Sequence, residues 1–594
     1  MFTTRPELAG TFGMAASTHW LASQTAMAVL ERGGNAFDAA VAAGFVLQVV
    51  EPHLNGPAGE VPIVAWVARE ARPTVVCGQG VAPAGASLRA FEDLGLSLIP
   101  GTGLLPACVP GAFGGWMLLL QRYGTMRLAD VLGYAIDYAN GGFPVVGRIT
   151  DTIGAVSDLF QKHWPTSAAT WLDGGGPPAP GSKFTNPGLG QTYARILAEA
   201  TAASADRDAQ IEAALHSFYQ GFVADAIDAF VAANPVMDST GDEHRGLLRG
   251  EDLAAWAAAE EAPVSLDYEG LRILKPGPWS QGPVFLQQLA LLRGIGLADL
   301  DPVSPEFAHA VVESAKLAFA DREAFYGDPA FVDVPLAELL SPGYNDGRRQ
   351  LISDRADTGA LRPGCPGGRE PRLARIVAAD AAAATAGSIG EPTVARDGRT
   401  RGDTCHVDIV DRWGNMVSAT PSGGWLQSSP TIPGLGFCLG TRGQMFYLDH
   451  GLPNSLAPGK RPRTTLSPTL ALREGRGALA FGTPGGDQQD QWSLLFFLRH
   501  VHHRMNLQEA IDAPAWHTTH FPSSFYPREA SPGRVHIEGR AGERTIAGLR
   551  DRGHDVSVAD DWSLGRISAV SNGADGLLRA GANPRGMQGY ATGR

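Results

Sequence analysis

The sequence predicts an α+β fold, with helices dominating the first part of the chain and strands opening the second. Three observations lead to this prediction. Helical patterns recur from residue 23 to residue 326, periodicity is lost over residues 353–402, and apolar and polar residues begin to alternate at Thr404. Because 594 residues exceed what one ordinary core encloses, two or more structural units are expected.

The first two helices are bounded by residues that stop and start helices. A helix over residues 23–32 ends at a glycine pair beginning with Gly33, because glycine accepts the left-handed conformation at a helix end. Asn35 can cap a second helix over residues 36–50, which ends before a proline. This helix is apolar nearly all round, which predicts that it is buried.

Further helical patterns follow within residues 105–141, 187–260 and 305–326. Residues 353–402 then combine Pro, Gly, Ala and many charges with little periodicity. Such a composition predicts an exposed and mobile segment.

Strand patterns begin at Thr404. Residues 404–411 alternate, which places Cys405 on one face of the strand and Thr404 and His406 on the other. A four-residue turn separates this strand from a second one at 416–422. Later strands are expected at 434–439, 444–449, 465–472 and 478–483, and helices at 490–504 and 507–512.

Composition and charge disfavour several classes of function. The formal net charge of -13 argues against a general nucleic-acid binder and against binding to anionic membranes. The first residues show no basic stretch followed by an apolar one, so no secretory signal is expected. The five cysteines are scattered, odd in number and without a CxxC pair, which argues against zinc and disulfide frameworks and favours a cytoplasmic location.

No metal site and no cofactor are predicted. The stretches HVHH (500–503) and HTTH (517–520) lack the carboxylate spacing of metal sites. No Walker loop, GxSxG elbow or Rossmann glycine fingerprint occurs. Structural roles are expected for His406 and Cys405, which lie beside Thr404 in the sequence.

Thr404 acquires a chemical role if the peptide bond after Asp403 is cut. A threonine hydroxyl is a weak nucleophile and needs an adjacent base. The α-amine released by the cut has a pKa of about 7.7–8.0 and can serve as that base. The same hydroxyl can make the first cut by attacking the Asp403 carbonyl.

Seven sequence blocks are spread over nearly the whole chain. They are ASTHWLASQTAMAVLERGGNAFDAAVAAGFVLQVVEPH (16–53), VPGAFGGW (109–116), ESAKLAFADREAFYGDPAF (313–331), GDTCHVDIVDRWGNMVS (402–418), SPT (467–469), GTPGGD (482–487) and IDAPAWH (511–517). Together, and in this order, they resemble the γ-glutamyltransferase family of N-terminal-nucleophile (Ntn) hydrolases. Thr404, in the fourth block, lies at the family's nucleophile position.

The resemblance implies a four-layer αββα sandwich and autocatalytic division into a large subunit, 1–403, and a small subunit, 404–594. The two subunits of one precursor would stay together, and a homodimer of such heterodimers is left open.

The resemblance also assigns the catalytic groups. Ser422 takes the place of a second hydroxyl that assists Thr404. Gly485 and Gly486 take the place of the oxyanion-hole glycines, whose backbone N–H groups would stabilise the tetrahedral intermediate.

The sequence departs from the family where true γ-glutamyltransferases bind glutamate. Gln79 stands in place of the arginine that holds the α-carboxylate, and the acids that hold the α-amine are missing. The altered or added side chains expected to bind substrate are Gln79, Trp425, Arg442, Thr464 and Thr465. The acids that would bind an α-ammonium group are absent and Arg442 is added, so the substrate is predicted to carry an acyl group with a carboxylate but no α-ammonium. Oxalyl, succinyl, glutaryl and α-keto-acid groups fit this description.

The predicted function is therefore hydrolysis of an amide or activated acyl bond in a small molecule. Branches of the family with this pattern resemble oxamate amidohydrolase and the homologues of lincosamide and pyrrolobenzodiazepine biosynthesis, which release an oxalyl unit by C–C cleavage. A role in antibiotic biosynthesis is thus one expectation. A genuine γ-glutamyltransferase or glutathione hydrolase and a non-catalytic binding protein are the alternatives.

Overall fold

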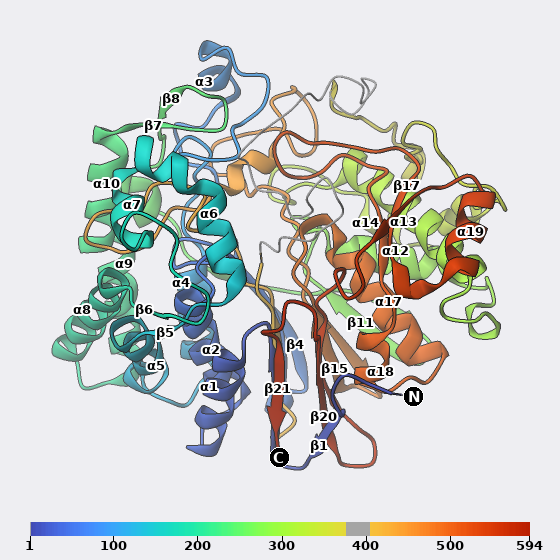
Figure 1. Cartoon of the computed structure of the whole chain (residues 1–594), viewed down its shortest axis with the longest axis horizontal. Coiled ribbons are helices and arrows are strands. Elements are labelled where there is room, and N and C mark those ends of the chain that lie inside the picture. Colours follow the sequence, from blue (N-terminus) through green and yellow to red (C-terminus); the bar gives the residue numbers. More distant parts are fainter. Residues whose placement is uncertain (1, 376–403) are drawn as a thin grey trace.

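Two large antiparallel sheets lie face to face between two layers of helices (Figure 1). The computed structural model describes residues 2–375 and 404–594. Asp403 and residues 376–402 of the predicted mobile segment lie outside the described residues. The helix–sheet–sheet–helix order confirms the predicted αββα sandwich.

Sheet I places the strand that follows Thr404 at its centre. In spatial order its strands are β21 (Tyr590–Gly593), β2 (Gly13–Ser17), β12 (Val407–Asp411), β13 (Met416–Ala419), β3 (Val61–Val67), β4 (Arg72–Gly78) and β9 (Ala259–Glu261). The last residue of the chain returns to this sheet, where the Arg594 carbonyl accepts a hydrogen bond of 2.7 Å from the Phe12 amide.

Sheet II also mixes strands from both parts of the chain. Its order is β1 (Leu8–Gly10), β20 (Leu578–Ala582), β19 (Ser568–Asn572), β15 (Arg476–Gly482), β14 (Thr469–Arg473), β11 (Leu271–Lys275) and β10 (Val264–Tyr268). Because each sheet contains strands from both sides of residue 403, the two predicted subunits are interleaved and share their sheets.

The two sheets pack through alternate residues of their strands. Val64, Trp66 and Met416 of sheet I contact a core that includes Leu470 and Val570 of sheet II. The other face of each sheet is buried by helices, so both faces are apolar, as expected of inner layers in a four-layer fold.

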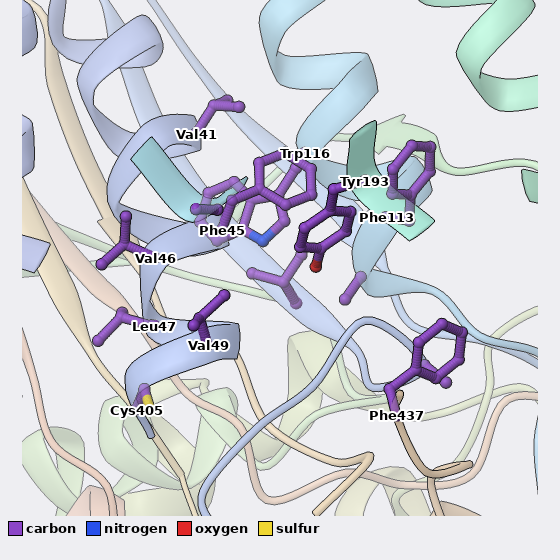
Figure 2. Close-up of a cluster of buried hydrophobic side chains, with 14 of the residues drawn as sticks. Val41, Phe45, Val46, Leu47, Val49, Phe113, Trp116, Tyr193, Cys405 and Phe437 are labelled. Atoms are coloured by element: carbon purple, nitrogen blue, oxygen red, sulfur yellow. The ribbon is translucent and has the colours of Figure 1, made fainter. Parts of the chain in front are cut away.

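The helices covering sheet I form the larger core. It is built around α2 (Ala36–Val50), in which every residue is buried and whose Asn35 cap accepts hydrogen bonds from two backbone amides. Figure 2 shows Phe45 of α2 among Phe113, Trp116 and Tyr193, with Cys405 of the sheet at the edge of the cluster. The accompanying helices are α1 (Trp20–Glu31), α4 (Ala112–Tyr123), α5 (Leu128–Gly141), α8 (Pro187–Ala203), α9 (Arg207–Tyr219) and α10 (Phe222–Ala233).

The helices covering sheet II come from both parts of the chain. They are α12 (Gly282–Leu292), α13 (Pro305–Phe325), α17 (Gln489–His502), α18 (Leu507–Asp512) and α19 (Glu543–Asp551). The remaining helices are short or peripheral: α3 (Leu88–Asp93), α6 (Gly147–Lys162), α7 (Pro165–Trp171), α11 (Gly250–Ala254), α14 (Leu336–Leu339) and α15 (Pro342–Arg349). Within the described residues, no helix is both long and apolar enough to cross a membrane.

Small sheets complete the fold. One joins β16 (Trp516–Thr518), β17 (Arg534–Glu538) and β18 (Asp555–Ala559), and two pairs join β5 (Phe143–Pro144) with β6 (Lys183–Phe184) and β7 (Pro235–Met237) with β8 (Glu243–Arg245).

Two predicted strands are wrong. Residues 434–439 form an irregular turn, because Gly434 and Gly436 adopt positive φ values of 78° and 73° that interrupt extended backbone. Residues 444–449 begin inside a short 3-10 helix, η5 (Arg442–Met445), and continue as loop. The described part of the predicted mobile segment, 353–375, is irregular and hydrogen-bonded to the rest of the molecule, for example from the Gly364 amide to Asp321 at 2.8 Å.

Candidate active site

Thr404 lies just before β12 and faces Ser422, which lies just after β13. The two residues form an isolated antiparallel bridge, and the Cys405 amide donates to the Pro421 carbonyl at 2.9 Å. The side-chain oxygens Oγ1 of Thr404 and Oγ of Ser422 are 3.1 Å apart. Both residues are buried, so the hydroxyl pair is held in a water-poor environment at the end of two neighbouring strands.

Arg442 extends this pair into a longer polar chain. Its Nη2 donates to Ser422 Oγ at 2.9 Å, and its Nε donates to the carboxylate of Glu60 at 2.6 Å. The guanidinium is only 1% exposed and lies near the rings of Trp425 and Phe525, at 5.1 and 5.8 Å from their centroids. Of the five predicted substrate-binding residues, Arg442 therefore makes the direct contact with the hydroxyl pair.

The glycine pair follows β15 of sheet II, whose last residue contacts the segment that begins at Thr404. Gly482, at the end of β15, packs on the His406 ring so closely that a Cβ at this glycine would lie 2.3 Å from His406 Cε1. Gly485 and Gly486 then take φ values of 122° and 52°, and the Gly486 carbonyl accepts a hydrogen bond from Gln281 at 3.2 Å. These backbone conformations favour glycine, which explains the residue type at the turn.

A second polar network lies behind the hydroxyl pair, between the sheets. His406 Nδ1 is 2.8 Å from Thr420 Oγ1, and His406 Nε2 is 3.0 Å from Asp408 Oδ1. Ser418 and Ser568 donate to the same Asp408 carboxylate. All of these side chains are buried, so the network joins β12 to β13 and to sheet II, which agrees with a structural role for His406.

The chain is similar to known proteins over nearly its whole length. The sequence model of the Gamma-glutamyltranspeptidase family matches residues 22–593. The chain belongs to this family. One curated relative is the glutathione hydrolase-like YwrD proenzyme of Bacillus subtilis (strain 168), which is 31% identical over 97% of this chain and 98% of its own length. Another is the oxamate amidohydrolase proenzyme of Klebsiella pneumoniae subsp. pneumoniae, which is 32% identical over 97% of each chain. The solved structure of LmbA2991T421A is 56% identical, with a TM-score of 0.94 and 100% coverage of both chains.

Gln79, Thr464 and Thr465 are three other residues predicted to bind substrate. The Gln79 side chain is buried and donates to the neighbouring Gly80 carbonyl at 3.1 Å. Thr464 bridges to Ser280, and its amide donates to the Trp279 carbonyl at 2.8 Å. Thr465 is buried with an unpaired hydroxyl. Within the part of the chain that the structure describes, none of these three side chains hydrogen-bonds to Thr404 or Ser422.

Trp425 lies beside Arg442, as noted above, and its indole N–H donates to the Leu54 carbonyl at 2.8 Å. The ring is fully buried with Met445 and Phe525. It therefore shapes the surroundings of the guanidinium through packing.

Glu51, a buried acid at the end of α2 that sequence analysis missed, lies next to Cys405, on the side opposite to the Thr404 side chain. Cys405 donates its thiol hydrogen to Glu51 at 2.9 Å, and Thr18 donates to the same carboxylate at 2.6 Å. Burial raises the pKa of Glu51 to about 7, and burial together with Glu51 raises the pKa of Cys405 well above its usual range. Cys405 is thus a protonated core thiol, in agreement with the packing role expected of it.

Among the described residues, the HVHH and HTTH stretches contribute to no group with metal-ligand spacing. One group with metal-ligand spacing does occur elsewhere, at His309, Glu313 and His554. However, the Glu313 carboxylate pairs with the Lys316 ammonium at 2.6 Å, so its charge is already balanced.

Glu60 is the functional candidate that sequence reasoning missed. It lies 382 residues before Arg442 in the chain, and no local pattern in the sequence links the two positions.

Proposed function

We propose that the protein is an autoprocessing acyl hydrolase that cuts its own chain between Asp403 and Thr404 and then uses Thr404 as nucleophile. The observation that supports this proposal most is the buried 3.1 Å contact between Thr404 and Ser422 at the head of the central strand. The relatives named as proenzymes support processing as well.

In the proposed reaction, the free α-amine of Thr404 accepts the proton of its own hydroxyl as Oγ1 attacks the substrate carbonyl. Ser422 hydrogen-bonds to Oγ1 and orients it. The backbone N–H groups at Gly485 and Gly486 stabilise the negative charge on the carbonyl oxygen, which is worth about 3–4 kcal/mol for each donor. The leaving group departs with the proton from the amine, and water then hydrolyses the acyl ester.

The position of Arg442 favours a short acyl group with an anion beside the reacting carbon. Two hydrogen bonds in series, 2.9 and 3.1 Å long, place Arg442 Nη2 no more than about 6 Å from Thr404 Oγ1. The attacked carbonyl carbon must approach Oγ1 to about 3 Å. A carboxylate attached directly to that carbon, as in an oxalyl or α-keto-acid group, can reach the guanidinium, whereas succinyl and glutaryl chains carry it farther away.

One donor of Arg442 remains for such a group. Within the described residues, Nη1 has a single polar neighbour, the Met445 sulfur at 3.8 Å, which is a weak acceptor. We assign Nη1 to the acyl carboxylate. The leaving group, either an amine or an activated carbon, and the cytoplasmic location and pathway predicted from the sequence remain proposals.

Four substrates with one leaving group test the acyl preference. We expect the oxalyl p-nitroanilide to be hydrolysed with the highest kcat/KM, followed by the succinyl, glutaryl and γ-glutamyl compounds. Preference for the γ-glutamyl anilide would instead establish the alternative, a genuine γ-glutamyltransferase. This alternative is considered because one relative is named a glutathione hydrolase-like proenzyme.

Processing is tested on a denaturing gel. The wild type should give two bands, Thr404→Ser should retain the cut because it keeps a hydroxyl, and Thr404→Ala should give one inactive band. Hydrolysis by the uncut Thr404→Ala protein would overturn the proposal. A single band for the wild type, with no turnover, would favour the non-catalytic alternative.

A further inference from the structure

Glu60 is a buried acid in contact with the residue that touches Ser422. Its carboxylate accepts a hydrogen bond from Nε of Arg442 at 2.6 Å and forms an ion pair with Nη2 of the same guanidinium. Glu60 is 4% exposed, and the chain packs tightly around its carboxylate: a Cβ at Gly423 would lie 2.7 Å from both carboxylate oxygens. Glu60 therefore holds the same guanidinium that donates to Ser422, and Nη2 contacts both residues.

Among the described residues, Glu60 is the acid that contacts the Arg442 guanidinium, so the two opposite charges balance each other. Cys108 faces both charges, and burial, followed by the charge of Glu60, raises the pKa of its thiol, so it stays protonated. The remaining neighbours described above are hydroxyl, aromatic and thioether groups. Without Glu60, a buried guanidinium would stand uncompensated beside the hydroxyl pair.

Such a charge would act on the amine that the proposed mechanism requires. The guanidinium is within about 6 Å of Thr404 Oγ1, and at this range a buried unit charge shifts a neighbouring pKa by about one to two units. A cation disfavours the protonated amine and lowers its pKa, which weakens it as a base. Among the described residues, the other charged or titratable groups on or beside this strand include His406 and Asp408 on the Thr404 face, and Cys405, Asp411 and Glu51 on or behind the other face.

We propose that Glu60 is a positioning residue that aims Arg442 at Ser422 and balances its charge, so that the Thr404 amine keeps the basicity needed to activate its hydroxyl. This inference rests on the proposed function, because the amine exists only after the cut. Glu60 itself touches neither Thr404 nor the substrate; it acts through Arg442.

Four variants separate charge from structure. Glu60→Gln keeps the shape of the side chain and removes its charge, and Glu60→Asp keeps the charge. The double variant Glu60→Gln/Arg442→Gln removes both charges. Glu313→Gln is the matched control, because Glu313 forms a comparable buried pair with Lys316 away from the site.

The readout is the pKa of the Thr404 α-amine in processed protein, measured by competitive labelling with acetic anhydride and mass spectrometry of the N-terminal peptide of the small subunit. The pH profile of kcat/KM for oxalyl p-nitroanilide gives a second measure. Labelling does not depend on the substrate, so a wrong choice of acyl group leaves this test intact.

We expect Glu60→Gln to lower the amine pKa, and the acidic limb of the profile, by about one unit or more. Glu60→Asp and Glu313→Gln should leave the amine pKa and the acidic limb of the pH profile unchanged. The double variant should restore the wild-type amine pKa, even if the single variant is poorly folded. An amine pKa unchanged in Glu60→Gln, or equally lowered in the double variant, would overturn the inference. Absence of a free Thr404 amine in active wild type would refute the proposed function instead.

Discussion

Replacing Gly485 by alanine tests the oxyanion assignment, because the structure leaves no room for a side chain there. Gly485 has φ 122°, and a Cβ would lie 2.2 Å from Cζ3 and 3.0 Å from Cε3 of Trp492. Trp492 is 1% exposed and packed within the core beneath sheet II. The ring has nowhere to move, so the turn carrying Gly485 must shift.

The size of the shift sets the expected loss of activity. Ordinary carbon contacts are about 3.5 Å, so the turn must move by about 1 Å to accept the methyl group. A displacement of about 1 Å at a reacting centre costs on the order of 10²-fold in rate, and loss of one oxyanion donor costs about 10²–10³-fold in kcat. Overpacking should also lower the free energy of unfolding by about 1–3 kcal/mol.

The assay compares kcat for p-nitroaniline release, the rate of self-cleavage and urea unfolding. Gly475→Ala is the matched control: Gly475 has φ 72° in the turn between β14 and β15, and nothing lies within 4 Å of its added Cβ. The Gly475→Ala enzyme should lose about 1–2 kcal/mol of unfolding free energy through backbone strain, and its kcat and self-cleavage rate should match those of the wild type. A Gly485→Ala enzyme with the kcat and cleavage rate of the wild type would refute the oxyanion assignment.

Three further perturbations follow from contacts in the structure. Ser422→Ala removes the hydroxyl that hydrogen-bonds to Thr404, the proposed nucleophile, and should lower both turnover and self-cleavage by about 10²-fold. Release of p-nitroaniline and a denaturing gel measure the two rates, and undiminished rates would exclude Ser422 from the mechanism. Glu51 has a folded-state pKa of about 7 against an ordinary 4.5, so the folded protein holds a proton that the unfolded chain releases, and stability should fall by about 3 kcal/mol as the pH rises between these values. Urea unfolding across this range should show the decline in the wild type and its loss in Glu51→Gln; equal slopes would contradict the assignment. The buried Lys275 ammonium lies 2.8 Å from the Asp490 carboxylate. Lys275→Met leaves this carboxylate without its cation and should lower the free energy of unfolding by about 3–5 kcal/mol in urea titrations. An unchanged free energy of unfolding would show that the ion pair is dispensable.

Local sequence signals predicted the helices well. The predicted helix 36–50 coincides with α2 (Ala36–Val50), because the Asn35 cap, the apolar surface and the following proline all agree. The strands beginning near 404 and 416 are also present. Thr404 and Ser422 themselves lie just outside β12 and β13, where a single bridge joins them.

The surroundings of the site were harder to predict. The stretch 434–449 contains strand-forming residues, but positive φ at Gly434 and a 3-10 turn at Arg442 override their preference. The pairing of Arg442 with Glu60 depends on strands and loops 382 residues apart in the chain. Such contacts are fixed by tertiary packing and leave no periodic trace in the sequence.

The interleaving of the two parts has a physical consequence for processing. β12 forms hydrogen bonds with β2 on one side and β13 on the other, so the strand would keep both neighbours after the proposed cut. The sheet would then hold the proposed new N-terminus at Thr404 in place. The two fragments should therefore remain associated after cleavage and separate only in denaturant.

The mass of the fragments in active protein tests the central claim most directly. Denaturing mass spectrometry of freshly purified, active enzyme should show two polypeptides, with the smaller one beginning at Thr404 and carrying a free α-amine. If activity instead resided in a full-length chain with the bond between Asp403 and Thr404 intact, no threonine amine would be available as base and the proposed mechanism would be contradicted.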